Sequence, residues 1–344
     1  MNDMSNAAES TRTLTLGRAV REAVHYEFEH NPDVFMMGQD IFKMGGIFGT
    51  AEGLGEKYGR SRVIDTPISE TAVVGAAAGA AMAGLRPIVD FAYVDFIGVC
   101  FNAIANYASK THYMSAGQFK MPMVLLVSTG GGYANAAQHS QSLHATIAHM
   151  PGIKVVCPTN AYDAKGMMHT ALRGDDFVVF LSSIATVGMM MLGSPIPATM
   201  SEVPKDDYEI PFGKARTYRE GKDVTLVGTG VSVHHCMEVA AELEKEGVDA
   251  EVIDPRSLVP LDRDAIFESV KKTGRLVAVD EDYLSYGIGS EILASVVERD
   301  PGVLKSAPVR LGCPDIPIPF AKPLEDHILP GPHHIMDAAR KVLA

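Results

Sequence analysis

Short apolar runs and segments of helical periodicity alternate twice along the chain, and this alternation restricts the chain to a layered α/β fold. The first series extends from Leu16 to about Leu181, and the second begins at Asp223 and continues to Leu311. Parallel strands must be joined by long crossovers, which are usually helices, so such a sequence predicts parallel sheets covered by helices. We therefore predict an α/β protein made of two doubly wound domains.

The expected elements follow from the apolar period and from breaker residues. In the first domain we predict strands at Val34–Met37, Val63–Ile64, Pro87–Phe91, Val124–Val127, Lys154–Val156 and Val178–Leu181, a helix at Gly17–Glu29 and a Gly- and Ala-rich helix from Glu70 to about Leu85. In the second we predict strands at Asp223–Val227, Ala250–Ile253, Arg275–Val279 and Val309–Leu311, and helices at Ser232–Lys245, Asp262–Lys272, Gly289–Arg299 and His333–Leu343. The Met- and Pro-rich stretch Ser182–Phe212 is the best linker candidate. The predicted boundaries are a flexible N-terminus (1–13), a first domain (14–200) and a smaller second domain (201–344).

The charge balance and the cysteines exclude several classes of function. The net charge of −12 argues against binding to nucleic acid or to an anionic membrane surface. The four cysteines lie far apart without a Cys-x-x-Cys pair, which predicts buried thiols in a reducing compartment and neither disulfides nor a zinc site. The start, Met1–Thr13, lacks the features of a signal peptide, and the most apolar run is shorter than the roughly 20 residues that span a bilayer. We expect a cytoplasmic protein without a membrane anchor.

Glu70 lies at the beginning of a predicted helix built almost wholly from Gly and Ala. Pro67 ends the preceding strand and Ser69 is expected to cap the helix, so Glu70 falls in the first turn, where the helix dipole favours an ionised carboxylate. Small residues at helical spacing allow another helix or a ligand to approach closely. We interpret Glu70 as a candidate functional carboxylate. The alternative is a first-turn acid that only stabilises its helix.

Two loops that follow strands are further candidates. His139 lies in a Gly-rich polar loop after the strand at Val124–Val127, at the end of the strand where parallel-sheet enzymes bind ligands, although a surface histidine is the alternative. The turn at Val227-Gly-Thr-Gly is similar to a dinucleotide-binding turn, but Val233 occupies the place of the third glycine, so a plain tight turn is favoured. The other histidines, His144 among them, lack a spaced acidic or Cys partner and are not assigned to a metal.

An ordered set of motifs resembles one protein family. These motifs are Met37-Gly-Gln-Asp, Arg62-Val-Ile-Asp-Thr-Pro-Ile-Ser-Glu, Gly84-Leu-Arg-Pro, Tyr113-Met-Ser-Ala-Gly-Gln, Ala137-Gln-His-Ser-Gln, Pro151-Gly-Ile-Lys-Val-Val and Asp163-Ala-Lys-Gly. From about Leu14 to its end, the chain resembles the β subunit of the thiamine-diphosphate-dependent decarboxylating component of 2-oxo acid dehydrogenase complexes. The segment Val94-Asp-Phe-Ile-Gly-Val-Cys-Phe looks most like acetoin dehydrogenase β subunits. The resemblance implies an N-terminal thiamine-pyrimidine-binding domain and a smaller C-terminal transketolase-like domain.

The resemblance implies roles for four residues. Glu70 matches the carboxylate that hydrogen-bonds the aminopyrimidine ring of thiamine diphosphate, and Phe96 matches the aromatic side chain that packs on this ring. His139 matches the histidine that contacts the substrate-derived intermediate and the incoming lipoyl group. Gln39, also expected beside the cofactor, stands where the family commonly has Glu. Because an amide cannot ionise, this replacement argues against a proton relay between paired active sites.

The resemblance also implies partners and ions. The chain has only Arg173-Gly-Asp-Asp in place of the Gly-Asp-Gly…Asn segment that holds Mg²⁺ and the diphosphate, so a partner α subunit must supply the metal end. The implied assembly is an α₂β₂ heterotetramer that works with a lipoyl-bearing dihydrolipoyl acyltransferase. A monovalent cation such as K⁺ is implied on backbone carbonyls, and the matching positions are Met123, Ala171, Leu172, Gly174 and Asp176.

The implied activity is cleavage of a small 2-oxo acid or acetoin at the bond beside the carbonyl, with transfer of the acyl group to the lipoyl carrier. Two alternatives remain open. Gln39, together with the Met-rich stretch Ser182–Thr199 in place of the family's usual Leu-Glu-His-x-x-Leu-Tyr, would also fit a noncatalytic scaffold or regulatory subunit. A transketolase-like enzyme split over two chains, with a sugar phosphate as substrate, is the other.

Overall fold

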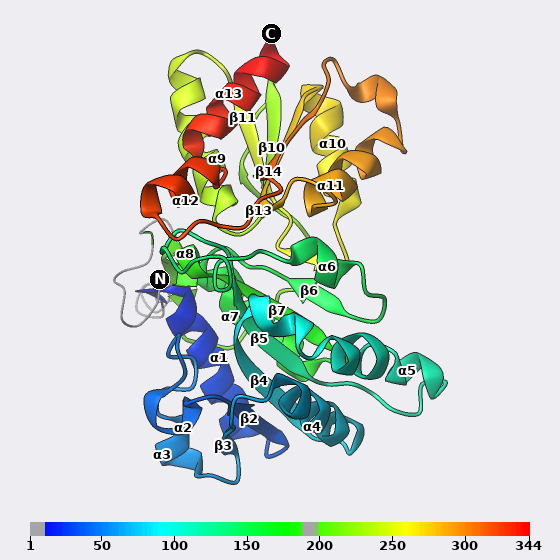
Figure 1. Ribbon diagram of the computed structural model, residues 1–344. Coiled ribbons are helices and arrows are strands. Elements are labelled where there is room, and N and C mark those ends of the chain that lie inside the picture. Colours follow the sequence, from blue (N-terminus) through cyan, green and yellow to red (C-terminus); the bar gives the residue numbers. More distant parts are fainter. Residues whose placement is uncertain (1–10, 188–195, 197–198) are drawn as a thin grey trace, which may run out of the picture. The chain divides into compact units, whose positions relative to one another are not determined.

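The computed structural model describes residues 11–187, 196 and 199–344, and these form two compact units (Figure 1). The first unit extends up to Ser128 and includes Met150–Phe212. The second unit consists of Thr129–His149 and Gly213–Ala344. The loop that carries His139 therefore belongs to the second unit, although it lies between strands of the first in sequence. Residues 188–195 and 197–198 of the predicted Met-rich stretch, and residues 1–10 of the predicted N-terminal segment, lie outside the described residues.

The sheet of the first unit has the strand order β6-β7-β5-β4-β2-β3. The strands are β2 (Val34–Gly38), β3 (Val63–Asp65), β4 (Arg86–Tyr93), β5 (Val124–Thr129), β6 (Lys154–Val156) and β7 (Val178–Ser183). The pairs β2/β3, β2/β4, β4/β5 and β6/β7 are parallel. Because parallel strands end at the same edge, the segments that follow β2, β3 and β4 emerge side by side.

Helices cover both faces of this sheet, as Figure 1 shows. On one face lie α1 (Leu16–His30) and α7 (Ala161–Arg173), whose apolar stripes share a core with Met36, Ile88 and Phe180 of the strands. On the other face lies α4 (Glu70–Met82). The remaining elements are α2 (Ile41–Met44), α3 (Leu54–Tyr58), η1 (Val94–Gly98), η2 (Ala103–Ala108), α5 (Thr111–Met114), α8 (Ile184–Val187) and the antiparallel pair β1 (Thr11–Leu14) and β8 (Ser201–Pro204).

The sheet of the second unit has the order β14-β13-β10-β11-β9. The elements of the second unit, inside and outside this sheet, are β9 (Arg216–Arg219), β10 (Val224–Gly228), α9 (Ser232–Lys245), β11 (Ala250–Asp254), β12 (Ser257–Val259), α10 (Arg263–Thr273), β13 (Leu276–Tyr283), α11 (Ile288–Val297), η4 (Pro301–Val303), β14 (Val309–Cys313), α12 (Lys322–Ile328) and α13 (Pro332–Leu343), with α6 (His144–Ala148) from the inserted loop. Leu226 faces a core with α9 and α13, whereas the next residue, Val227, faces a core with α10 and α11. This period of two places apolar residues on both faces of the sheet, as expected for a buried sheet.

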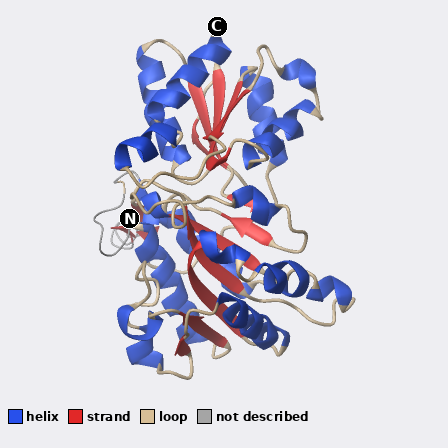
Figure 2. Ribbon diagram, viewed as in Figure 1, coloured by secondary structure: helices blue, strands red, loops and turns tan. Residues whose placement is uncertain are grey.

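The structure confirms the predicted fold class of two α/β domains (Figure 2). The predicted strands and helices of both domains are present, with bounds that shift by a few residues. Sequence analysis did not place α7, the pair β1 and β8, or the edge strand β9, which is antiparallel to β11. All four cysteines are free and buried, as predicted. Within the described residues, no helix has the length and apolar character required to cross a membrane.

Candidate active site

Glu70 is the first residue of α4, and its side chain is half-buried. The expected side-chain cap is absent: Ser69 makes no capping hydrogen bond through its hydroxyl, and only its carbonyl accepts from the N–H of Val73, at 3.0 Å. The first-turn N–H groups of α4 therefore lack the usual side-chain acceptor at the N-cap. Glu70 is the acidic residue in this turn, where the helix dipole stabilises a negative charge.

One face of α4 is open in the isolated chain. A Cβ atom added at Gly75 or at Gly79 would meet no atom within 4 Å, and Thr71 and Met82 are also exposed. The opposite face is buried through Val73, Val74, Ala77, Ala78 and Ala81. The small residues of the open face are therefore not required by packing within this chain, which agrees with the expectation that they allow close approach of another molecule.

Phe96 lies in η1, directly after β4, and is half-buried. The start of α4 contacts the segment that follows η1, because the Thr71 hydroxyl donates to the carbonyl of Val99 at 2.8 Å. Burial raises the pKa of Cys100 to about 12, and the charge of Glu70 adds to this increase. These contacts bring the elements that carry Glu70 and Phe96 together at one edge of the sheet.

Gln39 directly follows β2, the strand between β3 and β4, so it emerges at the same edge as the other two predicted cofactor residues. The end of β2 is packed tightly against its neighbour: a Cβ atom on Gly38 would lie 2.6 Å from the carbonyl oxygen of Asp90. This contact requires glycine and fixes the position of the backbone that leads into Gln39.

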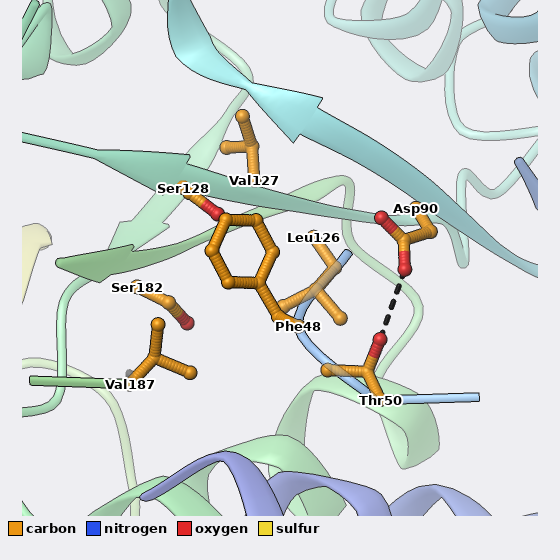
Figure 3. A pocket seen from close by; sticks show the side chains of 8 residues that line it. All are labelled: Phe48, Thr50, Asp90, Leu126, Val127, Ser128, Ser182 and Val187. Atoms are coloured by element: carbon orange, nitrogen blue, oxygen red, sulfur yellow. Dashed lines mark hydrogen bonds between the residues drawn. The ribbon is translucent and has the colours of Figure 1, made fainter. Parts of the chain in front are cut away.

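Asp90, which lies against Gly38, also lines a small pocket in the first unit (Figure 3). It is lined by Phe48, Thr50, Asp90, Leu126, Val127, Ser128, Ser182 and Val187. Its lining is mainly apolar, and its carboxylate, Asp90, already accepts a hydrogen bond from the hydroxyl of Thr50 at 2.9 Å. None of the predicted cofactor residues lines this pocket, so we do not assign the chemistry to it.

Asp90 gives the first unit a specific pH dependence. Burial raises the pKa of Asp90 to about 6, although hydrogen bonds from Thr50 and from the N–H of Ala92 act in the opposite direction. The folded state therefore holds this proton more tightly than the unfolded chain, so its stability falls as the pH rises from about 4 to about 6, by about 3 kcal/mol. In denaturant unfolding across this range, wild type should lose stability relative to Asp90→Asn. Parallel pH curves would contradict this assignment.

The loop between β5 and α6 carries His139, which is half-buried. The loop is closed by the N–H of Gly130, which donates to the carbonyl of Gln141 at 3.0 Å. Its backbone enters the left-handed region at Gly130, Gly132, Ala134 and Ala136, with φ values of +94°, +101°, +54° and +62°. Alanine adopts this conformation rarely, so contacts with the rest of the unit must hold the loop in place.

Buried acids of the second unit provide these contacts, and sequence analysis did not identify them. Both carboxylate oxygens of the fully buried Glu325 accept backbone N–H groups, from Gly132 and Ala134, each at 2.9 Å. At the other end of the loop, Nδ1 of His144 lies 2.8 Å from Asp280. Sequence analysis found no acidic residue at a metal-ligand spacing from His144, and it did not anticipate this distant partner. The available signal was the run of three acids, Asp280–Asp282, which continues an apolar strand.

The Val227-Gly-Thr-Gly segment forms a tight turn from β10 into α9. A Cβ atom on Gly228 would lie 2.7 Å from the backbone nitrogen of Val233, so glycine is needed for close approach of the turn and the helix. The hydroxyl of Thr229 donates to Asp280 at 2.6 Å. The turn is thus explained by internal contacts, in line with the favoured interpretation of a plain turn.

Three of the five carbonyls predicted for a monovalent cation accept hydrogen bonds within the chain. Nη1 of Arg86 donates to the carbonyls of Leu172 and Gly174, at 3.1 and 2.6 Å. The carbonyl of Met123 accepts the N–H of Val178 at 2.9 Å. The Arg86 guanidinium thus supplies positive charge at two of the five predicted carbonyls, which argues against an additional cation there. Among the described residues, no group of three or more His, Cys, Asp or Glu side chains could hold a metal ion.

This arrangement predicts that K⁺ has no specific effect on stability. Thermal unfolding in potassium chloride and in the same concentration of tetramethylammonium chloride should give the same midpoint, because Arg86 already occupies two of the carbonyls. An increase in the midpoint that requires K⁺ would contradict this expectation and would support the predicted cation site.

The comparisons with known proteins agree with the two α/β domains described above. Residues 12–187 match the model of the transketolase pyrimidine binding domain, and residues 213–335 match that of the transketolase C-terminal domain. The chain is 42% identical, over 342 residues, to "Acetoin:2,6-dichlorophenolindophenol oxidoreductase subunit beta" of Cupriavidus necator, with 96% of this chain and 98% of the relative covered. This chain belongs to the family of acetoin and pyruvate dehydrogenase E1 β subunits.

Other relatives support the same family. The acetoin:2,6-dichlorophenolindophenol oxidoreductase β subunit of Bacillus subtilis is 39% identical, with 96% of this chain and 98% of the relative covered. The mitochondrial pyruvate dehydrogenase E1 β subunit of Drosophila melanogaster is 41% identical, with 98% and 92% covered. A solved structure described as a split gene transketolase, inactive beta4 tetramer, has a TM-score of 0.75 at 24% identity, with 96% of this chain and 98% of that chain covered. At this identity it supports the fold alone.

The family is an oxidoreductase family that depends on thiamine diphosphate, and a β subunit of this kind is one part of a larger enzyme. Of the predicted site residues, the structure places Glu70, Phe96 and Gln39 after neighbouring strands of the first unit and His139 in the second unit.

Proposed function

We propose that this E1 β subunit is catalytic and that Glu70 is the carboxylate that holds the aminopyrimidine of thiamine diphosphate. The observation that carries this proposal is the position of Glu70: first turn of α4, half-buried, at the carboxyl edge of a parallel sheet within the segment that matches the pyrimidine binding domain. The neighbouring face of α4 is free of packing contacts at Gly75 and Gly79. These features fit a carboxylate that binds a ligand.

The residues of this chain fit the pyrimidine end of the cofactor. When bound, thiamine diphosphate supplies a thiazolium carbon acid that adds to a carbonyl group and stabilises the negative charge that follows bond cleavage. Glu70 would hold a proton at the aminopyrimidine ring nitrogen, and Phe96 would pack on the ring face. His139 would act on the substrate-derived group and on the lipoyl acceptor. Gln39 would donate or accept hydrogen bonds near the ring, and we propose no proton relay through it.

We propose an α subunit as the partner, in an α₂β₂ assembly, and a lipoyl-bearing dihydrolipoyl acyltransferase as the acceptor. The α subunit would supply the Mg²⁺ and diphosphate site, which this chain's own sequence does not provide. The names of the relatives support acetoin or a small 2-oxo acid such as pyruvate as substrate. The products would be an acyl group on the lipoyl carrier and either acetaldehyde, from acetoin, or carbon dioxide, from the 2-oxo acid.

The deciding experiment combines this chain with its candidate α subunit and measures turnover of acetoin, pyruvate and branched 2-oxo acids. The dye 2,6-dichlorophenolindophenol reports oxidation without the carrier, and a lipoyl domain reports acyl transfer. We expect cofactor binding and turnover with the pair and none with either chain alone. Failure of the pair to bind thiamine diphosphate would support the scaffold alternative, and turnover of a sugar phosphate would support the split transketolase.

A further inference from the structure

The loop from Thr129 to Leu143 is attached to the body of the second unit at both ends, and His139 lies between the two attachments. The first attachment is Glu325 of α12, which is fully buried and accepts two backbone N–H groups of the loop, at 2.9 Å each. A buried carboxylate is costly unless it is fully hydrogen-bonded, so these two N–H groups and Glu325 depend on each other.

Close packing reinforces this first attachment. A Cβ atom on Gly131 would lie 3.1 Å from the side chain of Leu329 and 3.3 Å from Oε1 of Glu325. The loop backbone therefore rests directly on α12 and leaves little space for a side chain. Gly130 and Gly132, with φ of +94° and +101°, allow the backbone to turn on each side of this contact.

The second attachment is a buried ion pair between α6 and β13. Nδ1 of His144 lies 2.8 Å from Oδ1 of Asp280, and both side chains are nearly inaccessible, with 3% and 4% exposed. Asp280 also accepts from the hydroxyl of Thr229, at 2.6 Å. The next residue of α6, Ala145, donates its backbone N–H to Asp282 at 2.9 Å. Two acids of β13 thus hold the end of the loop.

His144 also connects this attachment to the beginning of the loop. Its Nε2 lies 3.3 Å from the hydroxyl of Thr129, and that hydroxyl lies 3.4 Å from the carbonyl of Gln141. Burial lowers the pKa of His144, but Asp280, with Asp282 and Glu281 behind it, outweighs burial and raises this pKa to about 9. In the charged imidazole both nitrogens donate, which leaves the Thr129 hydroxyl free to donate to Gln141.

We infer that Glu325 and the His144/Asp280 pair are positioning residues for His139: they fix the backbone of its loop at both ends and so set the place of the imidazole. This inference rests on the proposed function of His139. The two Ala residues with positive φ, Ala134 and Ala136, precede His139 by a few residues, so the strained part of the loop begins at Glu325's second contact, Ala134, and continues toward the histidine. None of these positioning residues needs to touch substrate.

The first test measures the attachment itself, without reference to activity. In the assembled enzyme, amide hydrogen exchange in the loop is compared between wild type, Glu325→Gln and Asp326→Asn. Glu325→Gln directs an amide NH₂ at one of the two N–H donors, so exchange at Gly132 and Ala134 should accelerate. Asp326, which is adjacent in α12 and exposed, provides the matched control and should leave exchange unchanged. Equal exchange in wild type and Glu325→Gln would overturn the inference.

The second test asks whether the attachment acts through His139. Glu325→Gln should lower lipoyl acylation about 10- to 100-fold, as expected for a misplaced catalytic group, and should lower dye reduction less. In a His139→Asn background, Glu325→Gln should cause no further loss. If the double variant shows the product of the losses caused by Glu325→Gln and His139→Asn, Glu325 does not act through His139 and the inference fails. If the wild-type pair is inactive in both assays, the proposed function itself fails, which is a separate result.

Gly131→Ala is a milder substitution that tests the same attachment if the Glu325→Gln chain does not assemble with the α subunit. Gly131→Ala adds one methyl group against Leu329 and Glu325, at a position whose φ is not in the left-handed region. It should accelerate exchange in the same loop and lower lipoyl acylation in the same direction, with a smaller effect. A Gly131→Ala enzyme with wild-type exchange and wild-type acylation would overturn the inference as well.

Discussion

Glu70→Gln is expected to abolish turnover of the enzyme assembled with its α subunit while leaving the assembly intact. The amide keeps the size of the side chain, but it cannot hold a negative charge against the protonated ring of the aminopyrimidine. General acid–base and related proton-holding roles contribute about 10²- to 10⁴-fold in rate, so a loss of at least ~100-fold is expected. The same loss should occur in dye reduction and in lipoyl acylation, because both follow activation of the cofactor.

A loss of turnover in Glu70→Gln could arise from a destabilised α4 or from the missing carboxylate, and these two causes can be separated. Glu70 is half-buried and only its charge contributes to the helix, so the substitution should cost α4 about 0.3–1 kcal/mol. Glu56→Gln is the matched control, since Glu56 is also an acid in the first turn of a helix, α3, and is exposed. Its enzyme should turn over like wild type. Retained turnover in Glu70→Gln would place cofactor activation outside this carboxylate and would favour the scaffold alternative.

The sequence predicted those parts of the structure that depend on local pattern. Strands such as β6 and helices such as α9 have the predicted bounds, because apolar periodicity is a local property and burial follows from it. The sequence also predicted the start of α4 at Glu70, because Pro67 ends the preceding strand and the following residues are mostly Gly and Ala. The prediction that the Ser69 side chain caps α4 was wrong. The Ser69 backbone adopts φ −160° and ψ 69°, and its hydroxyl makes no capping hydrogen bond.

The parts that could not be predicted depend on pairing between residues far apart in sequence. His144 and Asp280 are 136 positions apart, and Glu325 is 193 positions from Gly132. Arg86 reaches carbonyls 86 and 88 positions away, and this contact argues against the expected cation site. A single sequence does not show which distant side chains meet. The inclusion of the His139 loop in the second unit has the same origin, since it depends on these contacts and not on the order of the strands.

His139→Asn is expected to separate the two halves of the reaction. If His139 acts on the incoming lipoyl group, its loss should lower lipoyl acylation by about 10²-fold or more, whereas dye reduction, which does not use the carrier, should be lowered much less. Asn keeps a polar group in the loop, so the substitution tests the imidazole and not the presence of a hydrogen-bonding side chain. Gln138→Ala, at the adjacent exposed position, is the matched control and should leave both rates near wild type.

The ratio of the two rates is the quantity that decides the role of this histidine. Equal losses in both assays would place His139 at a step that precedes the acceptor, such as substrate binding, and no loss in either would exclude it from the reaction. A selective loss of acylation would assign it to the transfer step. Glu70 is proposed to act before dye reduction and lipoyl acylation diverge, so Glu70→Gln should lower both rates equally. The contrast between Glu70→Gln and His139→Asn therefore shows which of the two residues acts first in the reaction.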